Sequence, residues 1–387
     1  MKVLKICTGT WGNASRDQRE LNVCRDLGAE TVILAKGNED DRGREDDVNG
    51  FRVFRCSSRP YKQLPVPINR FFSVFQWARF ASKLEADVIT GHDIDGWTIG
   101  WLSKLFRGKK KPILVYDSHE FELGRNKKRN KIHLYIIKLW EKKVINSSAF
   151  TMVVNDSIAD ELVKIHRLKK RPVVIRNIPD KWNIDPVKYK QKREELKKEF
   201  EGCNEKSILI YHGAVSHNRG IEQLLLAVAD LEGVNLLILG NPESEEYKNE
   251  LIEKYIQPIK DRIIVKSAVP HDQLWEYIGA ADLCIALIVP KYRSYFYALP
   301  NKLFEAIQAG TPILVSNLPE MKRIVEEYNI GECVEVDDIE AIKSAIKKML
   351  EHGRQPYEKG IEKAQKELTW DNEKETLKKA YSTILHS

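Results

Sequence analysis

Residues 208–228 read ILIYHGAVSHNRGIEQLLLAV and predict one strand, one loop and one helix. The apolar run at 208–211 is typical of a strand buried on both faces, and 221–228 repeats with helical spacing. Gly213 and Gly220 lie in the loop between them. Backbone NH groups at such a helix start suit a phosphate, and Arg219 adds a positive charge. An ordinary loop with a solvated arginine would look the same, because neither GxGxxG nor the P-loop pattern is present.

The same alternation of strand and helix continues in both directions along the chain. Apolar runs predict strands at 3–7, 31–35, 51–56, 87–90, 113–116 and 150–154, and again at 207–211, 235–239, 263–266, 283–287 and 313–316. Helical patterns fall between them, so the fold class is α/β, with parallel sheets covered by helices. We expect two doubly wound, Rossmann-like domains facing across a cleft, which is the default ligand site.

A strongly polar stretch at 181–206 divides the two series of strands and predicts a linker with a surface helix. The N-terminal domain would then span 1–180 and the C-terminal domain 207–368. A last helix, within 369–387, follows the second series and would return to the first domain.

The composition is that of a globular protein, with 42% hydrophobic and 9% aromatic residues among 387. No segment approaches the ~20 apolar residues that span a bilayer, and the N-terminal run reads as a strand rather than a signal peptide. Six scattered cysteines without a CxxC pair indicate a reduced, cytoplasmic protein without a zinc site or disulfide frame.

Positive charge gathers in residues 51–150, which hold 20 lysines and arginines against 8 acidic residues. KLFRGKKK (104–111) and RNKKRNK (125–131) carry much of it, and RFFSVFQWARF (70–80) is an aromatic helix. An anionic membrane surface could dock through 104–131, on the inner face of the membrane. A solvated basic face above a core helix would give the same pattern. Nucleic acid is not expected, because no nucleic-acid-binding motif accompanies the charge.

A second candidate ligand site is YALPNKLFEAIQAG, residues 297–310. Pro300 and Asn301 precede or begin a helix, where unpaired NH groups favour an anion, and Lys302 adds charge at the same end. Glu305, one turn on, could accept hydrogen bonds from vicinal hydroxyls. Phosphate beside hydroxyls describes a nucleotide diphosphate, although Glu305 alone could be a favourable first-turn acid.

Polar residues also follow three predicted strands of the first domain. Arg16 lies after the first strand, His92 and Asp93 follow another, and His119 and Glu120 follow VYDS. Carboxyl ends of parallel strands meet at one edge, so these loops should converge. We do not expect a metal there, because the residues come singly from separate loops without ligand spacing.

In order and spacing, several weak motifs together resemble the family 4 retaining glycosyltransferases, which have the GT-B fold. They include VITGHDIDGWTIGWL, VYDSHEFE, VIRNIPD, YHGAVSHNRGIEQLL, LPNKLFEAIQAGTPILVS and TWDNEKETLKKAYSTIL, and they cover nearly the whole chain. The resemblance implies a nucleotide-sugar donor bound by the second domain and an acceptor on the first.

The resemblance also implies roles for individual residues. Gly12 would lie near the donor phosphates, and His119 near the transferred sugar. Arg219 would bind the diphosphate and Glu305 the ribose, while Asn301, Lys302 and Leu303 would present backbone or charge to the phosphates. Two residues depart from the family pattern: Tyr297 replaces a glutamate that positions the sugar, and Ala214 replaces an arginine.

The expected activity is therefore retaining transfer of a hexosyl unit from a UDP- or GDP-linked sugar to a glycan or lipid-linked acceptor, in surface polysaccharide or glycolipid synthesis. No cofactor or metal is expected. A sugar-nucleotide epimerase of the same architecture and a non-catalytic nucleotide-sugar-binding subunit stay open as alternatives. Tyr297 and Ala214 make the second of these conceivable.

Overall fold

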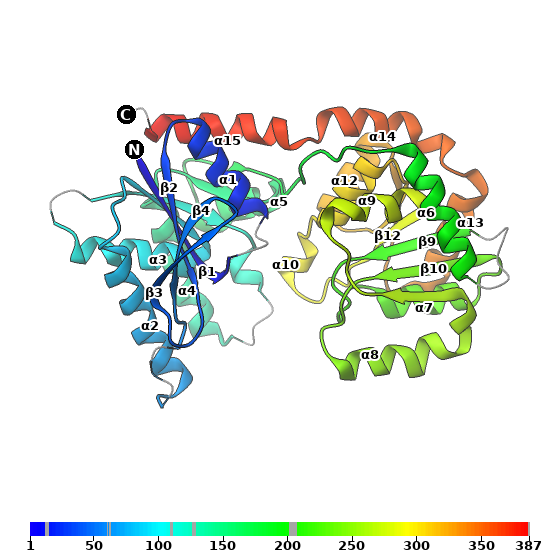
Figure 1. The fold of residues 1–387 in the computed structure, drawn as a ribbon, viewed down its shortest axis with the longest axis horizontal. Helices are drawn as coiled ribbons and strands as arrows, with labels where there is room; N and C mark the ends of the chain where they lie inside the picture. Colours follow the sequence, from blue (N-terminus) through cyan, green and yellow to red (C-terminus); the bar gives the residue numbers. More distant parts are fainter. Residues whose placement is uncertain are drawn as a thin grey trace. The chain divides into compact units, whose positions relative to one another are not determined.

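A computed structural model describes residues 1–11, 15–59, 61, 63–108, 111–125, 129–200 and 207–385. Two compact units divide the chain (Figure 1). Unit 1 comprises 1–177 and 371–387, and unit 2 comprises 178–370.

Unit 1 is built on an eight-stranded sheet in the order β3-β4-β2-β1-β5-β6-β7-β8. Its strands are β1 (Lys2–Thr10), β2 (Glu30–Lys36), β3 (Arg42–Val48), β4 (Phe51–Cys56), β5 (Val88–His92), β6 (Ile113–Ser118), β7 (Thr151–Val153) and β8 (Val173–Val174). All pairs are parallel except β3 with β4. The central strands are buried on both faces, which explains their largely apolar sequences.

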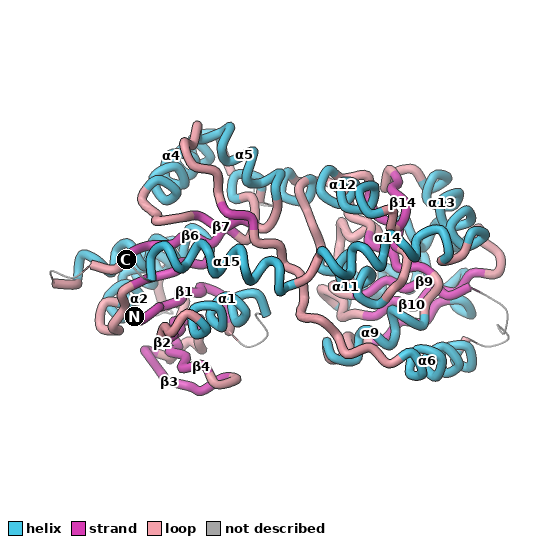
Figure 2. The backbone as a smooth tube through the Cα atoms, turned by 90° about the horizontal axis from the view of Figure 1, so that it is seen from above, coloured by secondary structure: helices cyan, strands magenta, loops and turns pink. Residues whose placement is uncertain are grey.

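Helices cover both faces of this sheet. They are α1 (Ser15–Asp26), α2 (Val66–Ala81), α3 (Asp93–Ser103), η1 (Lys104–Phe106), η2 (Glu122–Gly124), α4 (Lys131–Asn146), α5 (Asp156–His166) and α15 (Trp370–Leu385). The side chains of successive residues on a strand point to opposite faces of the sheet. On β5, Ile89 packs beside Gly100 of α3, whereas Thr90 bonds to Tyr381 of α15. Accordingly α2, α3 and α4 lie on one side of the sheet, and α1 and α15 on the other (Figure 1). Figure 2 shows α15 lying across the strands beside α1.

The hairpin of β3 and β4 is absent from the sequence-based expectation. Strand β3 reads RGREDDV and has no apolar alternation, because it is an edge strand that faces solvent. Its backbone pairs antiparallel with β4, and charged pairs cross the hairpin between Arg52 and Glu45 and between Arg55 and Asp46.

Unit 2 contains a six-stranded parallel sheet in the order β11-β10-β9-β12-β13-β14. The strands are β9 (Ser207–His212), β10 (Val234–Leu239), β11 (Ile263–Lys266), β12 (Leu283–Ala286), β13 (Ile313–Ser316) and β14 (Gly331–Val334). The helices are α6 (Pro186–Glu199), α7 (Ile221–Ala229), α8 (Glu245–Leu251), the π-helix η3 (Ile252–Ile256), η4 (Gln257–Arg262), α9 (His271–Ala280), α10 (Arg293–Phe296), α11 (Asn301–Ala309), α12 (Pro319–Tyr328), α13 (Ile339–His352) and α14 (Gln355–Glu367). Two doubly wound parallel-sheet units confirm the predicted fold class.

The stretch predicted as a linker and surface helix is part of unit 2. Helix α6 is mostly polar, yet Leu196 and Phe200 at its end are buried in the core of unit 2, and Trp182 before it is also buried there. Arg193 donates to the carbonyl of Ala280 and pairs with Asp282. Residues 201–206 lie outside the described part of the chain. Within the described residues, none of the helices is long and apolar enough to cross a membrane.

Candidate functional site

A cavity of about 390 Å³ opens in unit 2 at the carboxyl end of β9, beside the starts of α7 and α11. It brings together most of the residues that the sequence assigns to the donor. The lining includes Gly213, Ala214, Arg219, Pro300, Asn301, Lys302 and Glu305. The strand-end placement is the one at which parallel sheets bind ligands.

The loop between β9 and α7 needs its two glycines. Gly213 has φ 103° and Gly220 has φ 67°, and both values favour glycine. A Cβ atom at Gly220 would also lie 2.4 Å from Cβ of Leu287. The glycines therefore fix the turn that carries Arg219 to the helix start.

Two cations face this cavity without an internal counter-ion. Nζ of Lys302 lies 3.4 Å from the ring centroid of Tyr211, and Arg219 stacks over Tyr295 at 5.5 Å. Burial and the nearby charge of Arg219 lower the pKa of Lys302 to about 7. Neither cation forms an ion pair with any residue that the structure describes, and Nε of Arg219 has no hydrogen-bond partner there. An anionic ligand would relieve this uncompensated charge.

Glu305 is buried on the first turns of α11 and is held as a carboxylate. Burial would raise its pKa, but hydrogen bonds from His212 and His271 outweigh burial and lower it to about 2. Nε2 of His212 lies 2.8 Å from Oε2, and Nε2 of His271 lies 3.5 Å from Oε1. The sequence reasoning missed both histidines. Both could have been found, since His212 ends β9 directly before Gly213 and His271 is the first residue of α9.

Two predicted donor residues do not line the cavity. The Leu303 side chain is buried in the core, and its NH donates to the Pro300 carbonyl oxygen at 3.2 Å. Tyr297 directly follows α10, and its ring contacts that of Phe296 edge to face. Gly12 lies outside the described residues.

In unit 1, a buried cluster surrounds Lys5 of β1. Nζ of Lys5 lies 3.0 Å from Asp17 and 2.7 Å from Asp117, and it also pairs with Glu20. Burial alone would lower the pKa of Lys5, but the three carboxylates raise it well above its ordinary value. The sequence singled out neither Lys5 nor Asp17, because a lysine in an apolar strand and an acid in a polar helix carry no distinctive spacing.

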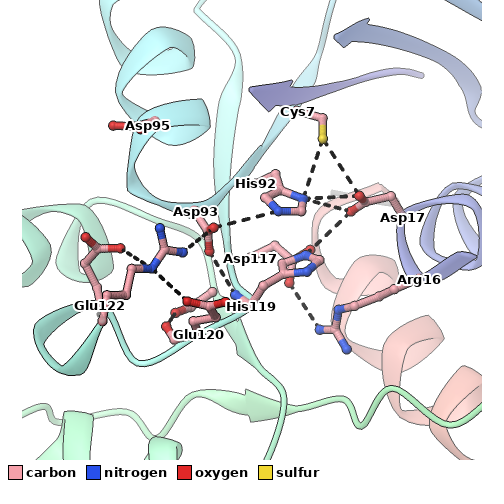
Figure 3. A network of polar contacts seen from close by, with 12 residues as sticks. Cys7, Arg16, Asp17, His92, Asp93, Asp95, Asp117, His119, Glu120 and Glu122 are labelled. Carbon is pink, nitrogen blue, oxygen red and sulfur yellow. Dashed lines mark hydrogen bonds and ion pairs between the residues drawn. The ribbon is translucent and has the colours of Figure 1, made fainter. Parts of the chain in front are cut away.

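The two predicted histidines stack beside this cluster (Figure 3), with ring centroids 3.7 Å apart. Nδ1 of His92 lies 3.1 Å from Asp17, and Nε2 of His119 lies 2.7 Å from Asp117. Burial would lower the pKa of His119, but the charge of Asp117 outweighs it and raises that pKa. No described residue bonds to Nδ1 of His119, so this atom is available to a substrate.

The other predicted acceptor-side residues converge on the same edge (Figure 3). Arg16 pairs with Asp117 at 3.1 Å, and Asp93 accepts from the backbone NH of His119 at 3.0 Å. Asp93 also pairs with Arg125, whose Nε lies 3.3 Å from the exposed carboxylate of Glu120. The three loops thus meet in space, as their placement after neighbouring strands indicates.

Potential metal ligands that the sequence leaves apart also meet here. Asp17, Asp117 and His119 could together hold a cation, and so could Cys7, Asp17 and His92. The ammonium group of Lys5 already neutralises Asp17 and Asp117 at ion-pair distance. A second cation among these groups would have to compete with this buried charge, so the donor set fits a metal poorly.

Unit 1 has a further cavity, of about 330 Å³, between the ends of β1 and β2 and helix α2. Lys36, Arg59 and Arg70 bring positive charge to it, and Asp95 pairs with Arg70. Val66, Val74 and Trp77 form an apolar wall. The cavity would suit a ligand with an anionic group and an apolar part.

Comparisons with known proteins agree with this architecture. A family model for glycosyl transferases group 1 matches residues 192–367, and one for glycosyltransferase family 4 matches 21–180. No curated protein matches the sequence significantly. Similar solved structures include sucrose-phosphate synthase from Thermosynechococcus elongatus (16% identity, TM-score 0.76, all of both chains covered). Also similar is Anabaena Alr3699/HepE in complex with UDP-glucose, with 14% identity, a TM-score of 0.73, and 99% of this chain and 100% of that chain covered. A glycosyltransferase from Rickettsia africae has 14% identity and a TM-score of 0.73, with 99% of this chain and 98% of that chain covered.

Proposed function

This chain belongs to the family 4, group 1 glycosyltransferases with the GT-B fold, and on that premise we propose a retaining hexosyltransferase that uses a nucleotide diphosphate sugar. The donor would be UDP- or GDP-linked, and the acceptor a glycan or lipid-linked sugar of surface polysaccharide or glycolipid synthesis. The complex of Anabaena HepE with UDP-glucose supports a UDP-linked donor.

The observation that carries the proposal is the unpaired charge of Arg219 and Lys302 beside the fixed carboxylate of Glu305. A diphosphate would take both cations as partners. Among the described residues, Oε1 of Glu305 has only the long contact with His271, so it can accept a hydrogen bond from a ribose hydroxyl.

In the proposed reaction, the bond between C1 of the sugar and the β-phosphate oxygen breaks, and the acceptor oxygen bonds to C1 on the same face. The acceptor proton passes to the departing phosphate, so the products are a glycoside and a nucleoside diphosphate. Arg219 and Lys302 stabilise the charge that grows on the leaving group. His119 donates from Nδ1 to a sugar hydroxyl, since Asp117 holds its other nitrogen. The scheme uses no metal or other cofactor.

The test measures nucleoside diphosphate release from a panel of UDP-, GDP- and ADP-linked sugars, with and without a membrane lipid extract, in a chelator of divalent metals. We expect release from one donor and its loss in Glu305→Ala. Anomeric analysis of the product should show retained configuration.

Binding of a nucleotide without release from any donor would contradict the proposal and favour a non-catalytic subunit. Conversion of the donor sugar into its epimer would favour an epimerase. Release that needs added metal would overturn the metal-free scheme while leaving the transferase in place.

A further inference from the structure

Helix α2 of unit 1 has one buried face and one exposed aromatic face. Trp77 and Ala78 face the core, and the indole of Trp77 donates to the carbonyl of Ser57. Phe71, Phe72 and Phe75 are between 37% and 59% exposed. Their rings contact one another, Phe71 and Phe72 edge to face, and Phe71 and Phe75 with centroids 4.8 Å apart. Three clustered phenylalanines in water are costly, which indicates a surface that another phase or partner covers.

Helix α4 carries a second apolar face of the same kind. Ile132, Tyr135, Ile136 and Leu139 are between 51% and 72% exposed, and their spacing places them on one side of the helix. The opposite side of α4 packs inward through Val144 and Ile145. Trp140 joins α4 to α3 by donating to Thr98 at 3.0 Å.

The two faces belong to one layer of helices. Helix α3 lies between α2 and α4 on the same side of the sheet (Figure 1), and η1 at its end exposes Leu105 and Phe106. Of the 18 exposed large apolar side chains among the described residues, 12 lie between Tyr61 and Leu139. The exposed apolar area is therefore concentrated on this layer, which we call the α2–α4 face (α2, η1 and α4).

The charge of the α2–α4 face is almost entirely positive. Its cations are Arg70, which pairs with Asp95 of α3, and Arg79, Lys104, Lys131, Lys138, Lys142 and Lys143. Its only acidic residue, Glu141, is buried and bonded to His166. The arginines of the predicted basic segment 125–131 are instead engaged, since Arg125 pairs with Asp93 and Arg129 with Glu122.

We propose that the α2–α4 face docks the protein onto an anionic lipid bilayer, with the phenylalanines and the α4 stripe entering the interface and the cations facing the headgroups. Apolar side chains flanked by lysine and arginine are the composition of interfacial helices. Each cation near an anionic surface adds attraction that salt screens. The amphipathic cavity that α2 lines with Val66 and Arg70 lies beside this face and suits a phosphate headgroup.

This inference goes beyond the proposed function and does not depend on it. The assay is co-sedimentation of the full chain with phosphatidylcholine vesicles, with and without phosphatidylglycerol, in the absence of nucleotide sugars. We expect binding to the anionic vesicles only, and weaker binding at high salt. If the protein did not bind the anionic vesicles, the proposed sugar transfer would be unaffected, because diphosphate release tests it separately.

Two double variants test the apolar part, Phe71→Ser with Phe75→Ser and Tyr135→Ser with Ile136→Ser. Because the side chains are exposed, both proteins should fold, which circular dichroism can verify. Each should bind the vesicles at least about tenfold more weakly. Lys138→Glu should weaken binding by about fivefold or more, since each charge near the surface is worth about a kcal/mol.

The matched control is Val187→Ser with Leu226→Ser, which removes two similarly exposed apolar side chains from unit 2. It should bind like the wild type. Equal loss in the control, unchanged binding in both test variants, or no binding of the wild type would overturn the proposal. A homodimer in sedimentation velocity that Ile136→Ser dissociates would overturn it in favour of a protein interface.

Discussion

The buried cluster of unit 1 and the cavity of unit 2 use positive charge in opposite ways. Lys5 is fully buried and has three carboxylates around it, Asp17, Glu20 and Asp117. Arg219 and Lys302 line a cavity and have no carboxylate partner among the described residues. In the first case the charge is balanced within the fold, and in the second the balance is left to a ligand.

The direction of the pKa shifts follows from this contrast. The carboxylates raise the pKa of Lys5 in spite of burial, whereas burial and Arg219 lower that of Lys302. Lys5 is thus held charged, whereas Lys302, in the proposed function, gains its full charge when an anion binds. Loss of the first should damage folding, and loss of either cation in the second should damage binding.

The largest effect should come from Lys5→Met. Removing the ammonium leaves three buried carboxylates without their shared cation, and breaking a buried ion pair in this way costs about 3–5 kcal/mol. Urea unfolding should show the loss directly. Adding Glu20→Gln should recover part of it, because one stranded charge is removed.

Lys2→Met is the control, since Lys2 lies on the same strand but is exposed and pairs with Glu85. It should leave the free energy of unfolding nearly unchanged, because an exposed ion pair contributes little to stability. Similar stability of the two variants would mean that Lys5 does not balance the cluster.

Arg219→Ala should show the opposite behaviour. Turnover of the donor should fall by about 10²–10³-fold, as for loss of one group that stabilises developing charge. Stability should not fall, because the substitution removes repulsion between Arg219 and Lys302. Diphosphate release and urea unfolding on the same preparation measure both.

Lys291→Ala removes an exposed cation from the loop after β12 and serves as its control, with turnover expected to match the wild type. If Arg219→Ala turned over donor normally, the cations of the cavity would not contact the diphosphate.

A pH titration should sharpen the contrast through Lys302. With its pKa lowered to about 7, Lys302 is half neutral at neutral pH, and a bound diphosphate would raise that pKa again. Binding then takes up a proton above pH 7, so the association constant should fall by up to about tenfold per pH unit as the pH rises. Below that pKa the lysine contributes no such dependence.

Calorimetry with UDP in buffers of different ionisation enthalpy measures this proton uptake. Lys302→Met should bind more weakly and lose the uptake. Equal uptake in the wild type and Lys302→Met would assign the proton to another group.

The sequence predicts most strands of the two parallel sheets because buried parallel strands such as β9 and β12 are short, mostly apolar runs. It misses β3, which is polar, and it expects the helix of α6 without indicating that Leu196 and Arg193 attach it to unit 2. Elements that only a few contacts hold in place show little hydrophobic periodicity in the sequence.

The candidate site divides in the same way. Gly213, Arg219, Lys302 and Glu305 could be placed together because each follows a strand or begins a helix. The groups that hold the cluster of unit 1 together could not, since Asp17 reaches His119, and Lys5 reaches Asp117, only through the folded packing. Short motifs indicate which groups meet a ligand, but not which groups hold them in position.

The smallest expected effect concerns α15, which ties the C-terminus to the cluster of unit 1. The hydroxyl of Tyr381 bonds to Glu20 and lies 2.7 Å from Oγ1 of Thr90. Burial and the charge of Glu20 raise the pKa of Tyr381 well above its ordinary value, so the hydroxyl stays protonated and donates to Glu20. Tyr381→Phe removes one hydrogen bond to a buried charge and should cost about 1.5–3 kcal/mol, less than Lys5→Met. The loss is smaller than that for Lys5→Met because Lys5 still balances the charge of Glu20. It should shrink further when Glu20→Gln is already present, because the hydroxyl then no longer bonds to a charge. Additive losses in that double-mutant cycle would show that the C-terminal helix is anchored by apolar packing, such as that of Tyr381 on Phe150, and not by the charge cluster.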